Sequence, residues 1–232
     1  YVKNDLNTSD MHPFIHPFSQ AVDPVWGSRN DWEIYKLFAA QVSKLATGHL
    51  GVVHDVVLTP ILHDTKAELG QGLALQDWAR GECTAIANLS MPNVTLVERD
   101  YSQIYNKYTS LGPLVETLGL GSKGINWKAD KEIKLLRELN YTTTEGRVKI
   151  ESDIDACELI LALSPETSGE VALKAWQAVS KFTGRSHTHL VEAREDEKIR
   201  FRDIQAQPRK IITSPTWSGI ESEHVSYTFS YT

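Results

Sequence analysis

The sequence is poor in cysteine, in long apolar runs and in excess positive charge. Only Cys83 and Cys157 occur in 232 residues, which supplies neither a disulfide framework nor a metal site built from clustered thiolates, so a reducing compartment is expected. No run of about 20 apolar residues and no signal-peptide pattern is present, so neither a membrane span nor a signal peptide is predicted. The net charge of -6 and the pI near 5.8 argue against nucleic acid as a partner.

What the chain does contain is typical of a soluble globular protein. Hydrophobic residues make up 41% and charged residues 23% of the sequence, which indicates neither disorder nor a fibre. A chain of 232 residues fits one large domain or two small ones and is long enough to bury a core. The chain also begins at Tyr1 without a methionine, as expected of an excised fragment.

Helical patterns dominate. Asn30 and Glu33 stand at capping-box spacing before a stripe of Ile34, Leu37, Phe38, Val42 and Leu45 that ends at Gly48. Thr167 and Glu170 form a second such pair ahead of a helix that closes near Gly184. Further helices are predicted over residues 100–108, 110–118, 130–139 and 154–163, the last of them apolar on more than one face and therefore buried.

Strand patterns are few. Val52–Leu58 and Asn93–Val97 are rich in β-branched residues and are predicted as strands, with a broken helical region over residues 64–81 between them. Residues 1–27 contain Pro13, Pro17 and Pro24 and are predicted as an extended, ordered loop. Because the strands are too scattered for a doubly wound sheet, the predicted fold class is mostly helical α+β, with a possible boundary near Leu50.

Two short motifs resemble ligand-binding patterns, but the residues around them do not support binding. Gly119, Gly121 and Gly124 spell G-x-G-x-x-G, but a leucine-rich helix precedes them where a dinucleotide fold needs a strand, so a helix-terminating loop is the preferred interpretation. His12 and His16 have zinc-like spacing, yet prolines follow both and no Glu follows His12, which favours rings that hydrogen-bond within a buried loop.

The last third of the chain carries irregular polar patterns. His187 and His189 alternate like residues on one face of a strand, and with His224 they could form a three-histidine site, although satisfied structural histidines are the preferred interpretation. Apolar residues interleave a group of cations, which predicts fixed contacts for these side chains. The group consists of Arg200, Arg202, Arg209 and Lys210. Internal carboxylates are the preferred partners, and a partner subunit or a cofactor's phosphates and guanine edges stay open.

Long strings of sequence carry a resemblance to a known family. They are DMHPFIHP (Asp10–Pro17), DWEIYK (Asp31–Lys36), VERDY (Val97–Tyr101), HTHL (His187–Leu190), EDEKIRFRDIQAQPRKII (Glu195–Ile212) and SPTWSG (Ser214–Gly219). Together with most of the remaining chain, they resemble the alpha subunit of respiratory, membrane-associated nitrate reductase, in the molybdopterin oxidoreductase superfamily. The resemblance implies an internal fragment of that larger catalytic subunit.

The resemblance also implies a reaction and its cofactors. Family members reduce nitrate to nitrite by oxygen-atom transfer in anaerobic respiration, using molybdenum held by bis-molybdopterin guanine dinucleotide and electrons from a 4Fe-4S cluster. The family's molybdenum-ligating aspartate and the Cys/His ligands of its cluster lie in an N-terminal part whose motifs do not occur here. The fragment is therefore expected to hold neither centre and to be inactive in isolation.

Residue by residue, the resemblance points to the start of the chain. By segment order, residues 1–50 form a cofactor-proximal loop and helix, and Asn7, Asp10, His12 and His16 are the candidate cofactor-binding residues. Residues 51–184 are expected to be a mainly helical insertion or scaffold used in subunit packing. Residues 185–232 are expected to return toward the catalytic body as an irregular segment.

The implied partners are the remainder of the alpha subunit, an iron-sulfur beta subunit, a membrane gamma subunit and nitrate. The implied location is the cytoplasmic face of the bacterial inner membrane, as a peripheral part of a membrane complex. Two other hypotheses stay open: a non-catalytic docking module, and the same superfamily acting on another oxyanion such as chlorate or selenate.

Overall fold

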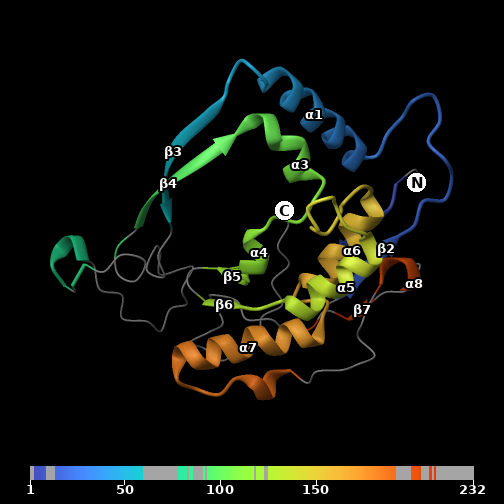
Figure 1. Cartoon of the computed structure of the whole chain (residues 1–232). Helices are drawn as coiled ribbons and strands as arrows, with labels where there is room; N and C mark the ends of the chain where they lie inside the picture. The colour runs from blue at the N-terminus through green and yellow to red at the C-terminus, as the bar shows by residue number, and fades with distance from the viewer. Residues whose placement is uncertain are drawn as a thin grey trace.

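The computed structural model describes residues 3–8, 14–59, 78–82, 84–85, 91, 93–117, 119–122, 125–191, 200–204, 209–210 and 212. Its helices are α1 (Asp31–Ala46), α3 (Ile104–Tyr108), α4 (Leu114–Thr117), α5 (Asp130–Asn140), α6 (Asp153–Leu163), α7 (Gly169–Thr183) and α8 (Phe201–Ile204). Short 3-10 helices are η1 (Trp78–Arg80), η2 (Tyr101–Gln103) and η3 (Thr188–Leu190). The strands are β1 (Asp5–Thr8), β2 (Phe14–Phe18), β3 (Val52–Thr59), β4 (Asn93–Asp100), β5 (Leu120–Ser122), β6 (Ile125–Trp127) and β7 (Arg209–Lys210). The fold is mixed α+β, as predicted (Figure 1).

The strands form small separate sheets, ordered β1-β2-β7, β3-β4 and β5-β6. All the pairs are antiparallel. The prediction of a loop over residues 1–27 was wrong for β1 and β2. Among the described residues, β7 pairs with Phe14 and Ile15 but not with Pro17, so the missing amide of Pro17 removes no bond on that side of β2.

Helix α6 lies at the centre of the described residues. One of its sides packs against α5 in a core cluster, and another packs against β1 and α8 through Cys157, Leu161, Leu6 and Phe201. The first cluster consists of Leu111, Ala129, Ile133, Leu136, Val148 and Leu163. This burial confirms the prediction that residues 154–163 form a buried helix. No described helix is both long and apolar enough to cross a lipid bilayer.

Helix α7 has its own core cluster and a different cap from the one predicted. Ala172, Trp176 and Val179 pack with Val191. The N-cap is Ser168, whose side chain accepts the N–H of Val171, rather than Thr167. Thr167 is buried and donates its hydroxyl to Leu161 O (2.9 Å), because the turn before the helix directs its side chain back onto α6.

The glycine-rich break also differs from its prediction. Residues 120–122 and 125–127 pair as the strands β5 and β6, where a helix-terminating loop was predicted. Gly119 enters the hairpin with φ +89, and a Cβ there would lie 2.2 Å from the carbonyl oxygen of Trp127. The glycine is required for this close backbone approach and does not form a phosphate-binding turn.

Helix α1 begins at its predicted cap but packs by an unexpected side. The Asn30 side chain accepts the N–H of Glu33, as an N-cap should. The buried residues of α1 are Ala39, Ser43 and Ala46, and this side contacts α3 and η2. The predicted apolar stripe mostly faces solvent. Its exposed members are Ile34, Leu37, Phe38 and Leu45.

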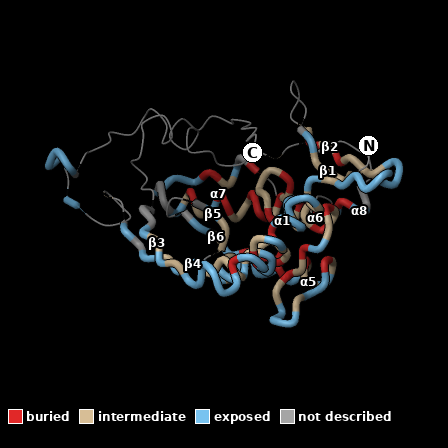
Figure 2. Tube along the Cα trace, turned by 90° about the horizontal axis from the view of Figure 1, so that it is seen from above, coloured by how far each residue is buried: buried red, intermediate tan, exposed pale blue. Residues whose placement is uncertain are grey.

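The predicted strands β3 and β4 pair over their full length into a two-stranded ribbon that leads away from α1 and α3 (Figure 1). Figure 2 shows the described part of this ribbon in exposed and intermediate colours rather than buried ones. Val56 and Leu96 are directly opposed in the register and both are exposed.

Candidate functional site

The acidic residues of α6 hold together three segments that are far apart in the sequence. At the start of the helix, Asp153 Oδ2 accepts the backbone N–H of Asn4 (2.8 Å) and the side-chain amide of Asn30 (2.9 Å). The Asn4 amide group donates to both Asp153 oxygens at 3.3 Å. One buried carboxylate therefore fixes the residue that precedes β1 and the N-cap of α1.

Further along α6, Asp155 and Glu158 bind α8. Glu158 is 1% exposed and accepts the backbone N–H groups of Phe201 (2.9 Å) and Arg202 (3.2 Å). The guanidinium of Arg202 donates to Glu158 Oε1 at 3.0 Å and to Asp155 Oδ1 at 2.7 Å. These contacts confirm the prediction of internal carboxylate partners for Arg202, because both acids would be costly to bury without a cation or donors.

The β1-β2 hairpin, fixed in this way, carries two of the predicted site residues. Asn7 and His16 are directly opposed in the register, so both side chains lie on the same face of the sheet. The alternate positions face the core instead: Ile15 is buried, and Leu6 packs against Cys157, Leu161 and Phe201. Asp10 and His12 lie outside the described residues.

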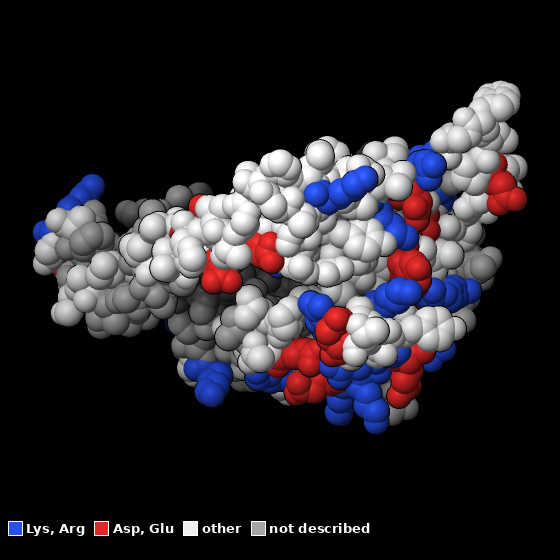
Figure 3. Space-filling view, turned by 45° about the horizontal axis from the view of Figure 1, so that its top comes forward, with Lys and Arg blue, Asp and Glu red and all other residues white. Residues whose placement is uncertain are grey.

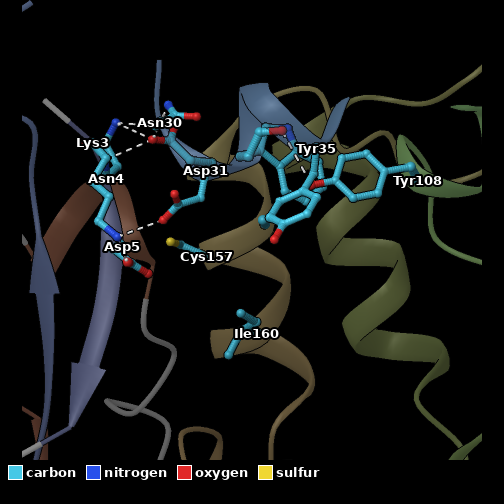
Figure 4. A pocket seen from close by; sticks show the side chains of 12 residues that line it. Lys3, Asn4, Asp5, Asn30, Asp31, Tyr35, Tyr108, Cys157 and Ile160 are labelled. Atoms are coloured by element: carbon cyan, nitrogen blue, oxygen red, sulfur yellow. Dashed lines mark hydrogen bonds and ion pairs between the residues drawn. The ribbon is translucent and has the colours of Figure 1, made fainter. Parts of the chain in front are cut away.

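A pocket of about 230 Å³ lies between the start of the chain, α1 and α6 (Figure 4). Its rim carries Lys3, Asp5 and Asp31, and the Lys3 ammonium contacts both carboxylates at 2.8 and 3.1 Å. These contacts raise the pKa of Lys3, the hydrogen bond to Asp5 being the largest cause. The rim is therefore an ion-pair network at the surface.

The wall of this pocket is aromatic. The rings of Trp32 and Tyr108 are stacked with centroids 4.4 Å apart, and burial raises the pKa of Tyr108. Trp32 Nε1 is buried and has no hydrogen-bond partner among the described residues. At the floor, burial raises the pKa of the Cys157 thiol to about 12, so this thiol is neither a thiolate ligand nor a nucleophile at neutral pH. The pocket thus combines an aromatic wall with a charged rim, and the thiol at its floor stays protonated.

Metal ligands do not gather in the described part of the chain. No group of three or more His, Cys, Asp or Glu able to hold a metal ion occurs there. His187 and His189 do not share a strand face: η3 begins at Thr188, and His187 is buried while His189 is exposed. His187 instead packs beside Trp176, with ring centroids 5.7 Å apart. His224 lies outside the described residues.

Sequence reasoning missed Asp153, Asp155 and Glu158. The interpretation of residues 154–163 rested on apolar residues alone. A signal was present, because acids within an otherwise apolar helix are rarely buried unless they are paired. Their presence in an apolar helix therefore indicated that each needed a hydrogen-bond or ion-pair partner.

Comparison with known sequences shows that this chain is homologous to part of a longer oxidoreductase chain. Residues 118–232 match the family model of nitrate reductase alpha chain, domain V. Over its whole length the chain is 58% identical to the respiratory nitrate reductase 1 alpha chain and 60% identical to the respiratory nitrate reductase 2 alpha chain, both of Escherichia coli (strain K12). It is 43% identical to the nitrate reductase alpha chain of Bacillus subtilis (strain 168), with 95% of this chain covered.

The chain belongs to the nitrate reductase alpha-chain family. It spans 19% of the length of each of these three relatives. The predicted resemblance is confirmed at the level of the family, and the chain is homologous to one part of an oxidoreductase.

Proposed function

We propose that this chain is a scaffold and cofactor-supporting segment of a molybdenum-dependent nitrate reductase, with no nitrate reduction of its own. The observation that carries the proposal is the fixed β1-β2 hairpin. Asp153 holds the backbone just before β1, and the core of Leu6, Cys157 and Phe201 holds the inner face of the hairpin. Asn7 and His16 are thereby presented together on its other face.

The chemistry of this face suits a pterin or a guanine edge. A carboxamide offers both a donor and an acceptor, and an imidazole offers the same pair in its neutral form. Asn7 and His16 would hold and orient such a group, with Asp10 and His12 proposed as its other contacts from the same segment. When bound, bis-molybdopterin guanine dinucleotide with its molybdenum supplies the oxygen-atom transfer that converts nitrate to nitrite.

An iron-sulfur cluster does not fit this segment. A 4Fe-4S cluster takes four ligands that are mostly thiolates, whereas the sequence contains 2 cysteines, and burial keeps Cys157 protonated. We therefore assign the 4Fe-4S cluster to the part of the alpha chain beyond this segment.

The proposal extends to organisation and setting. Residues 1–50 are the cofactor-side part, residues 51–184 a scaffold, and residues 185–232 a return toward the catalytic body. The partners are the rest of the alpha chain, an iron-sulfur beta subunit, a membrane gamma subunit and nitrate. The proposed location is the cytoplasmic face of the inner membrane.

The test uses the full-length alpha chain within its complex. His16→Leu and Asn7→Ala are compared with His189→Leu, a matched change of an exposed histidine on η3. Molybdenum and pterin content and nitrate reduction with a viologen donor are measured. We expect loss of cofactor or activity in the first two variants and none in the control. Normal cofactor content and activity in all three variants would exclude a cofactor-side role for the hairpin.

Related measurements would contradict the proposal or favour one of the two other hypotheses. Nitrate reduction or bound molybdenum in the isolated 232-residue chain would contradict the proposal. Faster turnover of chlorate or selenate than of nitrate by the intact complex would assign that oxyanion as the substrate. An alpha chain that lacks cluster and molybdenum ligands throughout would favour a docking module.

A further inference from the structure

Helix α1 exposes its apolar side on a part of the surface that carries few charges. Leu37, Phe38 and Leu45 lie three, four and eleven residues after Ile34 and so share one side of the helix with it, which is here named the α1 stripe. Phe38 and Leu45 are each 67% exposed. Figure 3 shows few charged side chains over this face, whereas the Lys, Arg, Asp and Glu side chains gather lower in the view.

The exposure of the α1 stripe does not come from a lack of internal packing. The opposite side of α1 is small and buried through Ala39, Ser43 and Ala46, and Ser43 Oγ accepts the backbone N–H of Tyr105 (2.8 Å). The helix is therefore already docked by one side and carries a second apolar side that this packing leaves uncovered. A helix with apolar residues on two opposite sides is expected to lie between two layers of the folded protein.

The ribbon that follows α1 shows the same property. A two-stranded ribbon is marginally stable in water unless one of its faces is packed. On the face that carries Val56 and Leu96, the exposed fractions are 70% and 65%. Val52 and Val94 add exposed apolar surface to the same face. The described residues therefore leave this face of the ribbon uncovered as well.

We propose that the α1 stripe and the Val56–Leu96 face of the ribbon are covered by the part of the alpha chain that lies outside this segment. This inference rests on the membership of the chain in the nitrate reductase alpha-chain family. The whole chain aligns with relatives of which it spans only 19%, so most of the polypeptide that could supply a second layer is not in the chain described here. A surface with several exposed apolar side chains also suits a permanent contact within one polypeptide better than a reversible one.

Hydroxyl-radical footprinting read by mass spectrometry tests this inference. Oxidation of Phe38, Leu45 and Leu96 is compared in the 232-residue chain, in the full-length alpha chain alone and in the complete enzyme. Buried Trp176, 2% exposed, reports that each sample is folded. We expect a several-fold lower oxidation of Phe38 and Leu45 in the alpha chain alone than in the 232-residue chain, approaching the level of Trp176.

Other outcomes overturn the proposal. Protection that appears only in the complete enzyme would assign the surface to a partner subunit. Concentration-dependent protection in the 232-residue chain would assign it to a second copy. Oxidation of Phe38 that stays high in every sample would leave the stripe uncovered.

A second measurement does not require the alpha chain to fold alone. Amine cross-linking of the complete enzyme from exposed Lys44, in the last turn of α1, should yield links to alpha-chain residues outside this segment. Links from Lys44 to the other subunits alone would refute the assignment. Neither experiment measures nitrate reduction, so its failure is distinguishable from failure of the cofactor-side proposal.

Discussion

Arg202 links α8 to the buried acids of α6, and its removal gives the sharpest stability prediction. Arg202→Met keeps much of the apolar stem and deletes the guanidinium. Glu158, 1% exposed, would keep two backbone donors and lose its contact with the one cation that reaches it among the described residues. Asp155 would lose its 2.7 Å contact and keep the capping bonds from the Ser152 region.

The expected magnitude follows from the burial of the two partners. Removing one member of a fully buried ion pair costs about 3–5 kcal/mol. The Arg202 side chain is 40% exposed, so water compensates part of the loss. We therefore expect the free energy of unfolding to fall by about 2 kcal/mol, between the values for buried and for surface pairs.

The assay is urea unfolding of the 232-residue chain, followed by tryptophan fluorescence and circular dichroism. The matched control is Arg137→Met, because Arg137 pairs with Glu116 at 2.6 Å where both side chains are 36% exposed. This control should lose less than about 1 kcal/mol. Equal losses in the two variants would refute the argument that Glu158 depends on Arg202 through its burial.

Two further predictions concern single sites. Gly119→Ala should reduce the free energy of unfolding by about 2–3 kcal/mol, because the φ of +89 and the Trp127 carbonyl both oppose a Cβ. The control is Gly112→Ala, whose added Cβ would meet no atom within 4 Å and should change the free energy of unfolding by less than about 0.5 kcal/mol in the same urea assay. Cys157, with its pKa raised to about 12 by burial, should resist alkylation at pH 8 until the chain is unfolded; rapid labelling of the folded chain would contradict this. The folded chain holds the Cys157 proton more tightly than the unfolded chain does. The contribution of this thiol to the free energy of unfolding is therefore fully present below about pH 8.5, the ordinary thiol pKa, and is lost as the pH rises toward 12.

Sequence patterns alone were sufficient to locate the main helices and the two strands of the long ribbon. The capping residue Asn30 and the apolar spacing after it located α1, and the same kind of pattern located α5, α6 and α7. The β-branched runs located β3 and β4. These signals are local, because hydrogen bonding and side-chain spacing within one segment decide them. The long quoted strings were sufficient for the family.

For the candidate site, the sequence supplied residue names, and the fold supplied their arrangement. Asn7 and His16 were named from a resemblance, and only the register of β1 and β2 placed them opposite each other. The partners of Asp153, Asp155 and Glu158 could not be predicted, because hydrogen bonds that join residues 4, 30 and 202 to one helix depend on how distant segments meet. Contact of Asn7, Asp10, His12 and His16 with a cofactor stays a prediction.

Helix α1 shows most clearly where local pattern ends and tertiary structure begins. The sequence determined that Ile34, Leu37, Phe38 and Leu45 form an apolar stripe, since a period of 3.6 residues follows from helix geometry alone. Only the tertiary structure decided that this stripe faces outward, with Ala39, Ser43 and Ala46 packed inside. Periodicity identifies an apolar side, but the layer that covers it is supplied by whichever part of the polypeptide folds against it.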